Sequence, residues 1–276
     1  MGNLEENLRT WTTHSWTEGG EEWSRVWGGS ANLWWGSLFP RIASHLPASN
    51  IVEIAPGAGR LSQYLSPWAK RLVLVDVTPR CVEICRERFA DRPHVEVRLN
   101  DGRTLPGVAD CSVQLVFSFD SLVHVDLEII GAYLAEIART LAPGGVAFLH
   151  HSNFAEFVDP ETGKAAIENH HWRDPGVSAK LVRREAERVG LRVLVQEQIN
   201  WGGDELIDAL TLLGRDADFP EVAPRCLENS GFMREAVSLA NLGSTWTAAG
   251  LDFSAKLAAP GATLRPSLWR RIKGGP

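Results

Sequence analysis

The sequence has 276 residues, of which 44% are hydrophobic, and a formal net charge of −6 at pH 7. A chain of this length and composition can bury the core of one large domain, and its negative charge provides no general attraction to nucleic acid or to an anionic membrane. It contains neither an apolar run of about 18 residues for a membrane span nor an opening signal segment, so we expect a cytoplasmic protein.

The four cysteines do not form a metal-binding pattern. Cys81 and Cys85 are four residues apart, which places both on one side of a helix, but no second pair accompanies them, and Cys111 and Cys226 stand alone. We interpret all four as reduced packing residues.

Tryptophans are concentrated in the first 48 residues. Their irregular spacing, with a turn predicted at Gly28 and Gly29, indicates one or two short helices rather than one long amphipathic helix. The six tryptophans of this segment are Trp11, Trp16, Trp23, Trp27, Trp34 and Trp35.

Residues 51–60, IVEIAPGAGR, are the stretch around which the rest of the chain is organised. An apolar run leads to Gly57 and Gly59 and then to a helical pattern, which predicts a strand, a tight turn and a helix. Glycine permits the positive φ of such a turn and lets a ligand approach the backbone closely. Glu53 is predicted at the carboxyl end of the strand, where open parallel sheets bind their ligands.

The glycine pattern favours a methyl donor over a dinucleotide. A dinucleotide site requires a third glycine where Ser62 stands, and a carboxylate at the turn would repel a pyrophosphate but attract a cationic ligand. The acid followed by P-G-A-G resembles the first motif of the class I S-adenosylmethionine-dependent methyltransferases, with Ala55 replacing the first glycine. The resemblance implies that Glu53, Ala55, Gly57 and Gly59 hold S-adenosylmethionine. A buried strand with a plain glycine turn is the alternative.

The next two strands supply further acids for the same ligand. One apolar run ends at Asp76, whose carboxylate can accept both hydroxyls of a ribose or, alternatively, begin a helix. Residues 95–100 predict another strand, and the resemblance places Asp101 near the adenine amino group, with Val77 and Gly102 beside the cofactor. The sequence N-D-G is also common in plain turns.

The fourth predicted strand, residues 112–119, is followed by the segment D-S-L-V-H-V-D. By resemblance, residues after this strand line the opening through which the methyl group faces its acceptor, and Phe119 lies beside the cofactor. His124, with Asp126 two residues later and Asp120 four residues earlier, fits a general base that is oriented by a carboxylate. A hydrogen-bonded structural imidazole is the alternative.

A second motif supports the resemblance. Residues 127–141 have helical spacing of apolar residues and lead through A-P-G-G into a strand at 146–150, which is similar to a late motif of the same family. The family implies an α/β fold with a doubly wound, mostly parallel, Rossmann-like sheet of seven strands. Its last pair is an antiparallel hairpin, here predicted at 191–201 and 205–215.

The resemblance also divides the chain into three parts. Residues 1–48 form a helical segment, of which about residues 10–36 fold over the cofactor as a lid. Residues 49–215 are the cofactor-binding core, with an acceptor-side insertion at about 152–176, and residues 216–276 are a helical extension. Trp16 and Trp27 are predicted to contact the ligand, whereas the other indoles pack on the sheet.

An oxygen acceptor needs a base to remove its proton. His150 and His151, at the end of the fifth strand, are candidates beside His124, but neighbouring residues of a strand point to opposite faces, so at most one of the pair is expected to reach the ligand. Asp120, His150 and His151 could alternatively hold Mg²⁺, which would acidify a bound hydroxyl. No fixed-spacing motif indicates a metal.

The abundance of tryptophan and histidine suits a carbohydrate acceptor, because C–H faces of sugars stack on indoles. The motifs are similar to those of bacterial O-methyltransferases of saccharide and natural-product pathways. We therefore predict O-methylation of a small molecule, with a sugar, oligosaccharide or glycoside as first choice, no nucleic-acid or membrane partner, and compatibility with a homodimer. Methylation of a small-molecule amine and a non-catalytic cofactor-binding protein are the alternatives.

Overall fold

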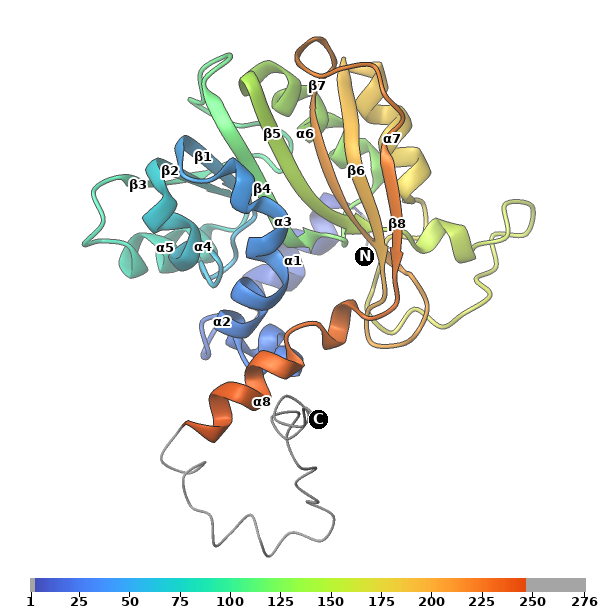
Figure 1. Ribbon diagram of the computed structural model, residues 1–276, viewed down its shortest axis with the longest axis horizontal. Coiled ribbons are helices and arrows are strands. Elements are labelled where there is room, and N and C mark those ends of the chain that lie inside the picture. The colour runs from blue at the N-terminus through green and yellow to red at the C-terminus, as the bar shows by residue number, and fades with distance from the viewer. Residues whose placement is uncertain (1–2, 247–276) are drawn as a thin grey trace, which may run out of the picture.

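The computed structural model describes residues 3–246, which are organised around one eight-stranded sheet in the order β3-β2-β1-β4-β5-β7-β6-β8 (Figure 1). Strands β1 to β5 run parallel to one another, and β7 is antiparallel to both β5 and β6. The bounds are β1 (Ala48–Ile54), β2 (Ala69–Asp76), β3 (Val95–Leu99), β4 (Val113–Leu122), β5 (Leu141–Ser152), β6 (Leu191–Ile199), β7 (Asp208–Arg215) and β8 (Arg225–Asn229). The predicted Rossmann-like sheet with its antiparallel hairpin is confirmed.

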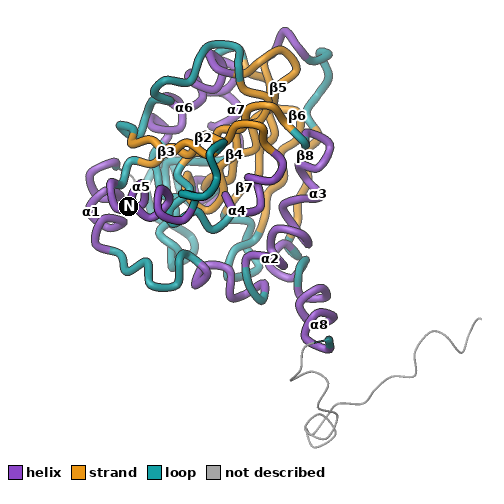
Figure 2. The backbone as a smooth tube through the Cα atoms, turned by 90° about the vertical axis from the view of Figure 1, so that its left-hand side faces the viewer, coloured by secondary structure: helices purple, strands orange, loops and turns teal. Residues whose placement is uncertain are grey.

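Helices cover both faces of this sheet, and short 3-10 or π turns join several of them (Figure 2). The helix predicted after β1 is only one turn of α-helix, because a 3-10 turn and then β2 follow it directly. The helices are α1 (Leu4–Thr13), α2 (Ser30–Leu33), α3 (Phe39–Ile42), α4 (Ser62–Leu65), α5 (Pro79–Arg88), α6 (Leu127–Thr140), α7 (Ala179–Arg188) and α8 (Val237–Thr245), and the 3-10 segment η1 covers Glu21–Trp27.

Alternating side chains of the central strands divide the core in two. Leu72 and Leu74 of β2 belong to the layer formed with the tryptophans of the N-terminal segment, whereas Val73 and Val75 belong to the layer formed with α6 and α7. This alternation follows from the two-residue repeat of a strand. Because Ile51 lies in the first layer, Glu53 is directed to the same face, toward the N-terminal segment.

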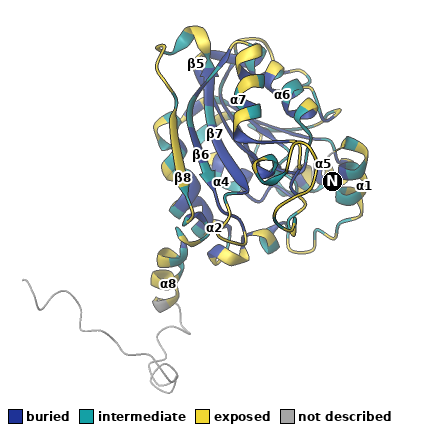
Figure 3. Cartoon of the chain, turned by 90° about the vertical axis from the view of Figure 1, so that its right-hand side faces the viewer, coloured by how far each residue is buried: buried dark blue, intermediate teal, exposed yellow. Residues whose placement is uncertain are grey.

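The C-terminal part of the chain differs from its prediction. Residues 216–276 were expected to be helical, but β8 pairs in parallel with β6 and adds an eighth strand to the sheet. Four of its five residues are exposed at the sheet edge (Figure 3), so the segment lacks the apolar alternation that reveals a half-buried strand. Residues 247–276 of the predicted extension lie outside the described residues.

A partly buried ionic network fastens the N-terminal segment to this edge. Arg41 of α3 donates to Glu197 of β6 from Nε at 2.8 Å and to Glu235 from Nη2 at 2.7 Å, and Asn229 donates to both carboxylates. Such paired and hydrogen-bonded charges tolerate burial, whereas loss of one partner would be costly. Within residues 3–246, no helix is long and apolar enough to span a bilayer.

Candidate active site

A cavity of about 590 Å³ lies at the carboxyl ends of β1, β2 and β4, beneath α1 and η1. Its floor includes Ala55, Gly57 and Asp76, and its roof includes Trp11 and Trp16. This is the position where open parallel sheets bind their ligands. The structure therefore brings the predicted glycine turn and the predicted lid to opposite sides of one cavity.

The turn after β1 has three residues with positive φ. Gly57 and Gly59 have φ of 58° and 76°, and Ala55 has a φ of 53° although it carries a Cβ. A Cβ on Gly57 would lie 3.1 Å from the ring of Trp16, and one on Gly59 would lie 2.7 Å from Phe89. Gly57 is therefore needed for the approach of the lid, whereas Gly59 is needed for packing against α5.

Two buried acids lie beside this turn. Burial raises the pKa of Glu53 to about 7, and its Oε2 atom has no hydrogen-bond partner among the described residues. Burial also raises the pKa of Asp76 to about 6, although the main-chain N–H groups of Thr78 and Gly57 donate to it at 2.8 and 3.1 Å. A buried carboxylate oxygen without a partner, next to glycines at 57 and 59 that let a ligand approach the backbone, fits a cationic ligand such as S-adenosylmethionine.

Val77 and Gly102, which were predicted beside the cofactor, also line the cavity. Leu4 of α1 packs so closely on Gly102 that a Cβ there would lie 2.5 Å from its side chain. Asp101 does not line the cavity. Its Oδ1 atom instead accepts the N–H groups of Arg103 and Thr104 at 2.9 and 2.7 Å, which is the plain turn that the sequence also allowed.

The two tryptophans predicted to contact the ligand occupy different environments. Trp16 lines the cavity above Gly57. Trp27 borders the same region but is completely buried, and its ring packs 5.2 Å from Trp201 and 5.9 Å from Phe232, measured between centroids. Its surroundings are those of a core residue.

His124 is the one predicted base that lines the cavity. Its Nδ1 atom lies 3.1 Å from the carbonyl oxygen of Trp172, and because a carbonyl only accepts, this contact leaves Nε2 as an acceptor. Burial, together with the charge of Arg173, lowers the pKa of His124 to about 4. The main-chain oxygen of His124 accepts from Asn7 of α1 at 2.8 Å, which connects the lid to this segment.

Asp126 does not orient His124, contrary to the prediction. It is the N-cap of α6 and accepts the N–H of Ile129 at 2.9 Å. Its side chain fits the usual role of aspartate before a helix. The position expected for this carboxylate, beside Nδ1 of His124, is occupied by the carbonyl of Trp172, which lies 48 residues after His124 in the chain.

His150 and His151 are both buried and neither lines the cavity. His150 accepts the main-chain N–H of Asp120 at 3.0 Å and faces Asp208 at 3.1 Å, so both of its nitrogens are engaged. His151 contacts the oxygens of Ser152 and Thr211 at 2.9 and 2.8 Å, and burial lowers its pKa to about 4. The predicted use of one of them as a base does not fit this arrangement.

The predicted metal ligands do not converge either. Asp120 lines the cavity but is paired with Arg60 at 3.1 Å, and His151 is engaged by Thr211. Within the part of the chain that the structure describes, no group of three His, Cys, Asp or Glu residues is arranged to hold a metal ion.

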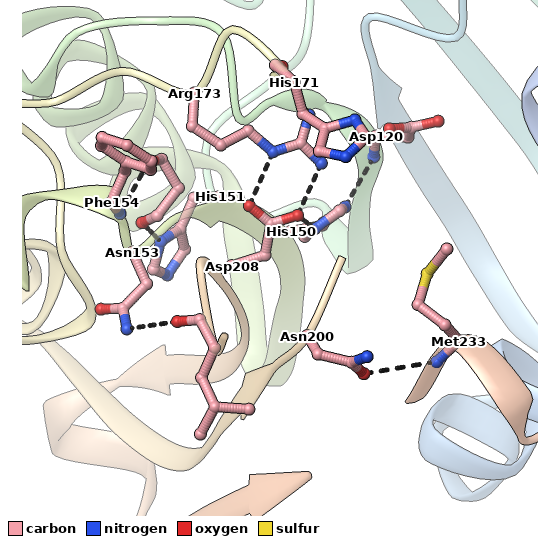
Figure 4. A network of polar contacts seen from close by, with 12 residues as sticks. Asp120, His150, His151, Asn153, Phe154, His171, Arg173, Asn200, Asp208 and Met233 are labelled. Atoms are coloured by element: carbon pink, nitrogen blue, oxygen red, sulfur yellow. Dashed lines mark hydrogen bonds and ion pairs between the residues drawn. The ribbon is translucent and has the colours of Figure 1, made fainter. Parts of the chain in front are cut away.

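The sequence did not reveal the polar network behind Phe119, which itself lines the cavity and stacks on His150 at 4.6 Å. Figure 4 shows Arg173 and His150 converging on Asp208. Arg173 donates to both carboxylate oxygens at 2.8 and 2.6 Å. Although burial alone would raise the pKa of Asp208, the charge of Arg173 holds it well below its usual range. No local sequence pattern predicts the contacts of Asp208 with His150 and Arg173, because Asp208 lies on β7, His150 on β5 and Arg173 in the loop between β5 and α7.

Comparisons with known proteins agree with this geometry. Residues 51–145 match the family described as "Methyltransferase domain". The chain is similar to Nodulation protein S of Sinorhizobium fredii, at 27% identity over 118 residues that cover 41% of this chain and 50% of that protein.

Two solved structures share the fold. The N-methyltransferase NodS from Bradyrhizobium japonicum, in complex with S-adenosyl-L-homocysteine, has a TM-score of 0.54 at 19% identity, over 76% of this chain and 97% of that chain. A protein from Pyrococcus horikoshii has a TM-score of 0.56 at 18% identity, over 77% and 100%. The fold expected from the motifs is thereby confirmed, while the chain spans about half the length of the curated Nodulation protein S that it matches.

Proposed function

We propose that the protein is an S-adenosylmethionine-dependent methyltransferase that methylates a small-molecule acceptor, in line with the match of residues 51–145 to a methyltransferase domain. The observation that supports this most directly is the cavity of about 590 Å³ between the glycine turn and the tryptophans of the lid. Cavities of this size accommodate small ligands. When bound, S-adenosylmethionine would supply an electrophilic methyl group, and the protein's own contribution is to hold the acceptor in line with it.

We favour nitrogen over oxygen as the accepting atom. Two of the three candidate histidines are buried away from the cavity, and the third, His124, has a pKa of about 4, far from the value near neutrality that suits a general base. An ammonium group, with an ordinary pKa of about 10, loses its proton to water far more readily than an alcohol does, and the neutral amine then has the lone pair that can accept a methyl group. The likeness to an N-methyltransferase, NodS, points the same way.

A hydroxyl acceptor, such as a sugar or glycoside, is the second candidate. It is supported by His124, which lines the cavity and keeps Nε2 as an acceptor. Several tryptophans around the cavity, among them Trp11 and Trp23, offer surfaces on which a sugar could stack.

Cofactor binding is tested by calorimetric titration of the full chain with S-adenosylmethionine and, separately, with NAD. We expect micromolar affinity for the methyl donor and a loss of about tenfold or more in Asp76→Asn, since one charge-assisted hydrogen bond is worth roughly 1.5–3 kcal/mol. Asp101→Asn is the matched control, because its carboxylate holds its own turn outside the cavity. Preference for NAD, or no binding of the donor, would refute the proposal.

The accepting atom is tested by following methyl transfer from labelled donor to a panel of small amines and saccharides. For a nitrogen acceptor, His124→Gln should lower kcat by less than about tenfold, whereas removal of a general base costs roughly 10²–10⁴-fold. A drop within that larger range, together with transfer to saccharides, would establish the hydroxyl alternative instead.

A further inference from the structure

Glu22 of η1 is a charged side chain in the cavity that lacks a full set of partners. Its Oε1 atom accepts from Nε2 of His14 at 3.2 Å, whereas its Oε2 atom is buried and has no hydrogen-bond partner within residues 3–246. A buried carboxylate oxygen without a partner is costly. Glu53 is the other cavity-lining residue with such an atom, and it belongs to the floor beside the glycine turn.

Three indole rings pack around the imidazole of His14, which contacts Glu22. The imidazole of His14 lies 5.7 Å from the ring of Trp11, 4.8 Å from that of Trp16 and 5.6 Å from that of Trp23, measured between centroids. Glu22 and all three tryptophans line the cavity. Indole faces attract cations, and tryptophan does so more strongly than the other aromatic residues.

Apart from the contact with His14, no free arginine or lysine of the described cavity lining balances Glu22. Each of the three arginines that line the cavity is paired with a carboxylate, and no lysine is among the described residues of the lining. The pairs are Arg25 with Glu18, Arg60 with Asp120, and Arg173 with Asp208. An anionic acceptor would therefore find no free partner here, whereas a cationic group would find an unpartnered carboxylate oxygen.

We propose that Glu22, Trp11 and Trp23 form a subsite for a positively charged nitrogen of the acceptor, so that the substrates are ammonium compounds. This inference rests on the proposed function and specifies its substrate class. The subsite is separate from the floor of the cavity: Glu53 and Asp76 project from the sheet, whereas Glu22 belongs to the lid. Trp11 also lies 5.6 Å from His124, which places the subsite next to the segment that follows β4.

The test uses the full chain saturated with S-adenosyl-L-homocysteine and two probes of matched shape, tert-butylammonium and the neutral tert-butanol. Ligand-observed NMR titration should show that the ammonium binds at least about tenfold more tightly, because both the carboxylate and the indoles favour the charge. Glu22→Gln, which keeps the shape of the side chain, should remove most of this preference.

Two further variants complete the experiment. Trp23→Leu should also weaken ammonium binding, and because Trp23 is 36% exposed, this change leaves the core intact. Glu5→Gln removes one charge from an exposed position of α1 and should leave the preference unchanged. The affinity for S-adenosyl-L-homocysteine should be the same in all of these proteins.

Each outcome is decisive. Equal binding of the two probes by the wild-type protein, or an undiminished preference in Glu22→Gln, would overturn the subsite. A loss of S-adenosyl-L-homocysteine affinity in Glu22→Gln as large as the loss of ammonium affinity would assign Glu22 to the cofactor and overturn it as well. Failure of the wild-type protein to bind S-adenosyl-L-homocysteine at all would instead refute the proposed function.

Discussion

Glu53→Gln should change how the stability of the ligand-free protein depends on pH. Burial raises the pKa of Glu53 from an ordinary value of 4.5 to about 7, so between these values the folded protein retains a proton that the unfolded chain has released. Stability from this group is therefore fully present below about pH 4.5 and is lost as the pH rises through about 7. At about 1.4 kcal/mol per pH unit, the loss amounts to about 3 kcal/mol.

Glutamine does not titrate, so the variant lacks this loss. The free energy of unfolding of Glu53→Gln, minus that of the wild-type protein, should rise by about 3 kcal/mol between pH 4.5 and pH 8. Any fixed cost of burying the amide cancels in this comparison, and Asp76, whose pKa is also raised, is present in both proteins. The assay is urea unfolding of cofactor-free protein, followed by tryptophan fluorescence at several pH values.

The matched control is Glu87→Gln, at an exposed position of α5, for which the difference should stay within about 0.5 kcal/mol across the range. Binding of the cationic methyl donor provides a second measurement. Its affinity should increase as the pH rises through about 7 in the wild-type protein and stay level in Glu53→Gln. A stability difference that does not vary with pH would refute the assignment of a raised pKa to Glu53.

Three further substitutions test other contacts of the site. Gly57→Ala places a Cβ 3.1 Å from the ring of Trp16 at a φ of 58°, so the free energy of unfolding should fall by about 1–2 kcal/mol. Calorimetry should also show weaker binding of S-adenosylmethionine, and unchanged affinity would mean that the lid does not rest on this turn. Asp126→Ala removes the N-cap of α6 and should lower the free energy of unfolding by about 1 kcal/mol with turnover unchanged; lost turnover at full stability would restore its predicted catalytic role. Asp208→Asn leaves the buried Arg173 without its charged partner, and a cost of about 3–5 kcal/mol should appear as a lower melting temperature; an unaltered melting curve would contradict the importance of this pair.

The elements next to the cofactor could be predicted from the sequence because their signals are local. A strand and the turn that follows it are indicated within about ten residues by the apolar run up to Glu53 and the glycines at 57 and 59. The apolar run before Asp76 indicates the next strand in the same way. Parallel strands then bring their carboxyl ends to one edge of the sheet without further information. The floor of the cavity follows from these facts.

The acceptor side depended on contacts between distant segments. Adjacent histidines at 150 and 151 look equivalent in the sequence, yet one is held by Asp208, 58 residues later, and the other by Thr211, 60 residues later. The proposed role of Glu22 likewise depends on its contact with the imidazole of His14 and on the indoles that pack on that imidazole. Periodicity reports which face of an element is buried, but not which side chain of another element will be opposite.

The sequence by itself therefore determined the parallel core of the sheet with its antiparallel hairpin, the glycine turn, and the acids Glu53 and Asp76 that line the cavity. The tertiary structure decided which of the predicted histidines reaches the cavity, that every arginine of its lining is already paired, and that one carboxylate oxygen of the lid has no partner among the described residues. The physical reason is that hydrogen bonds and ion pairs between side chains depend on positions in space, which the order of residues along one segment does not specify.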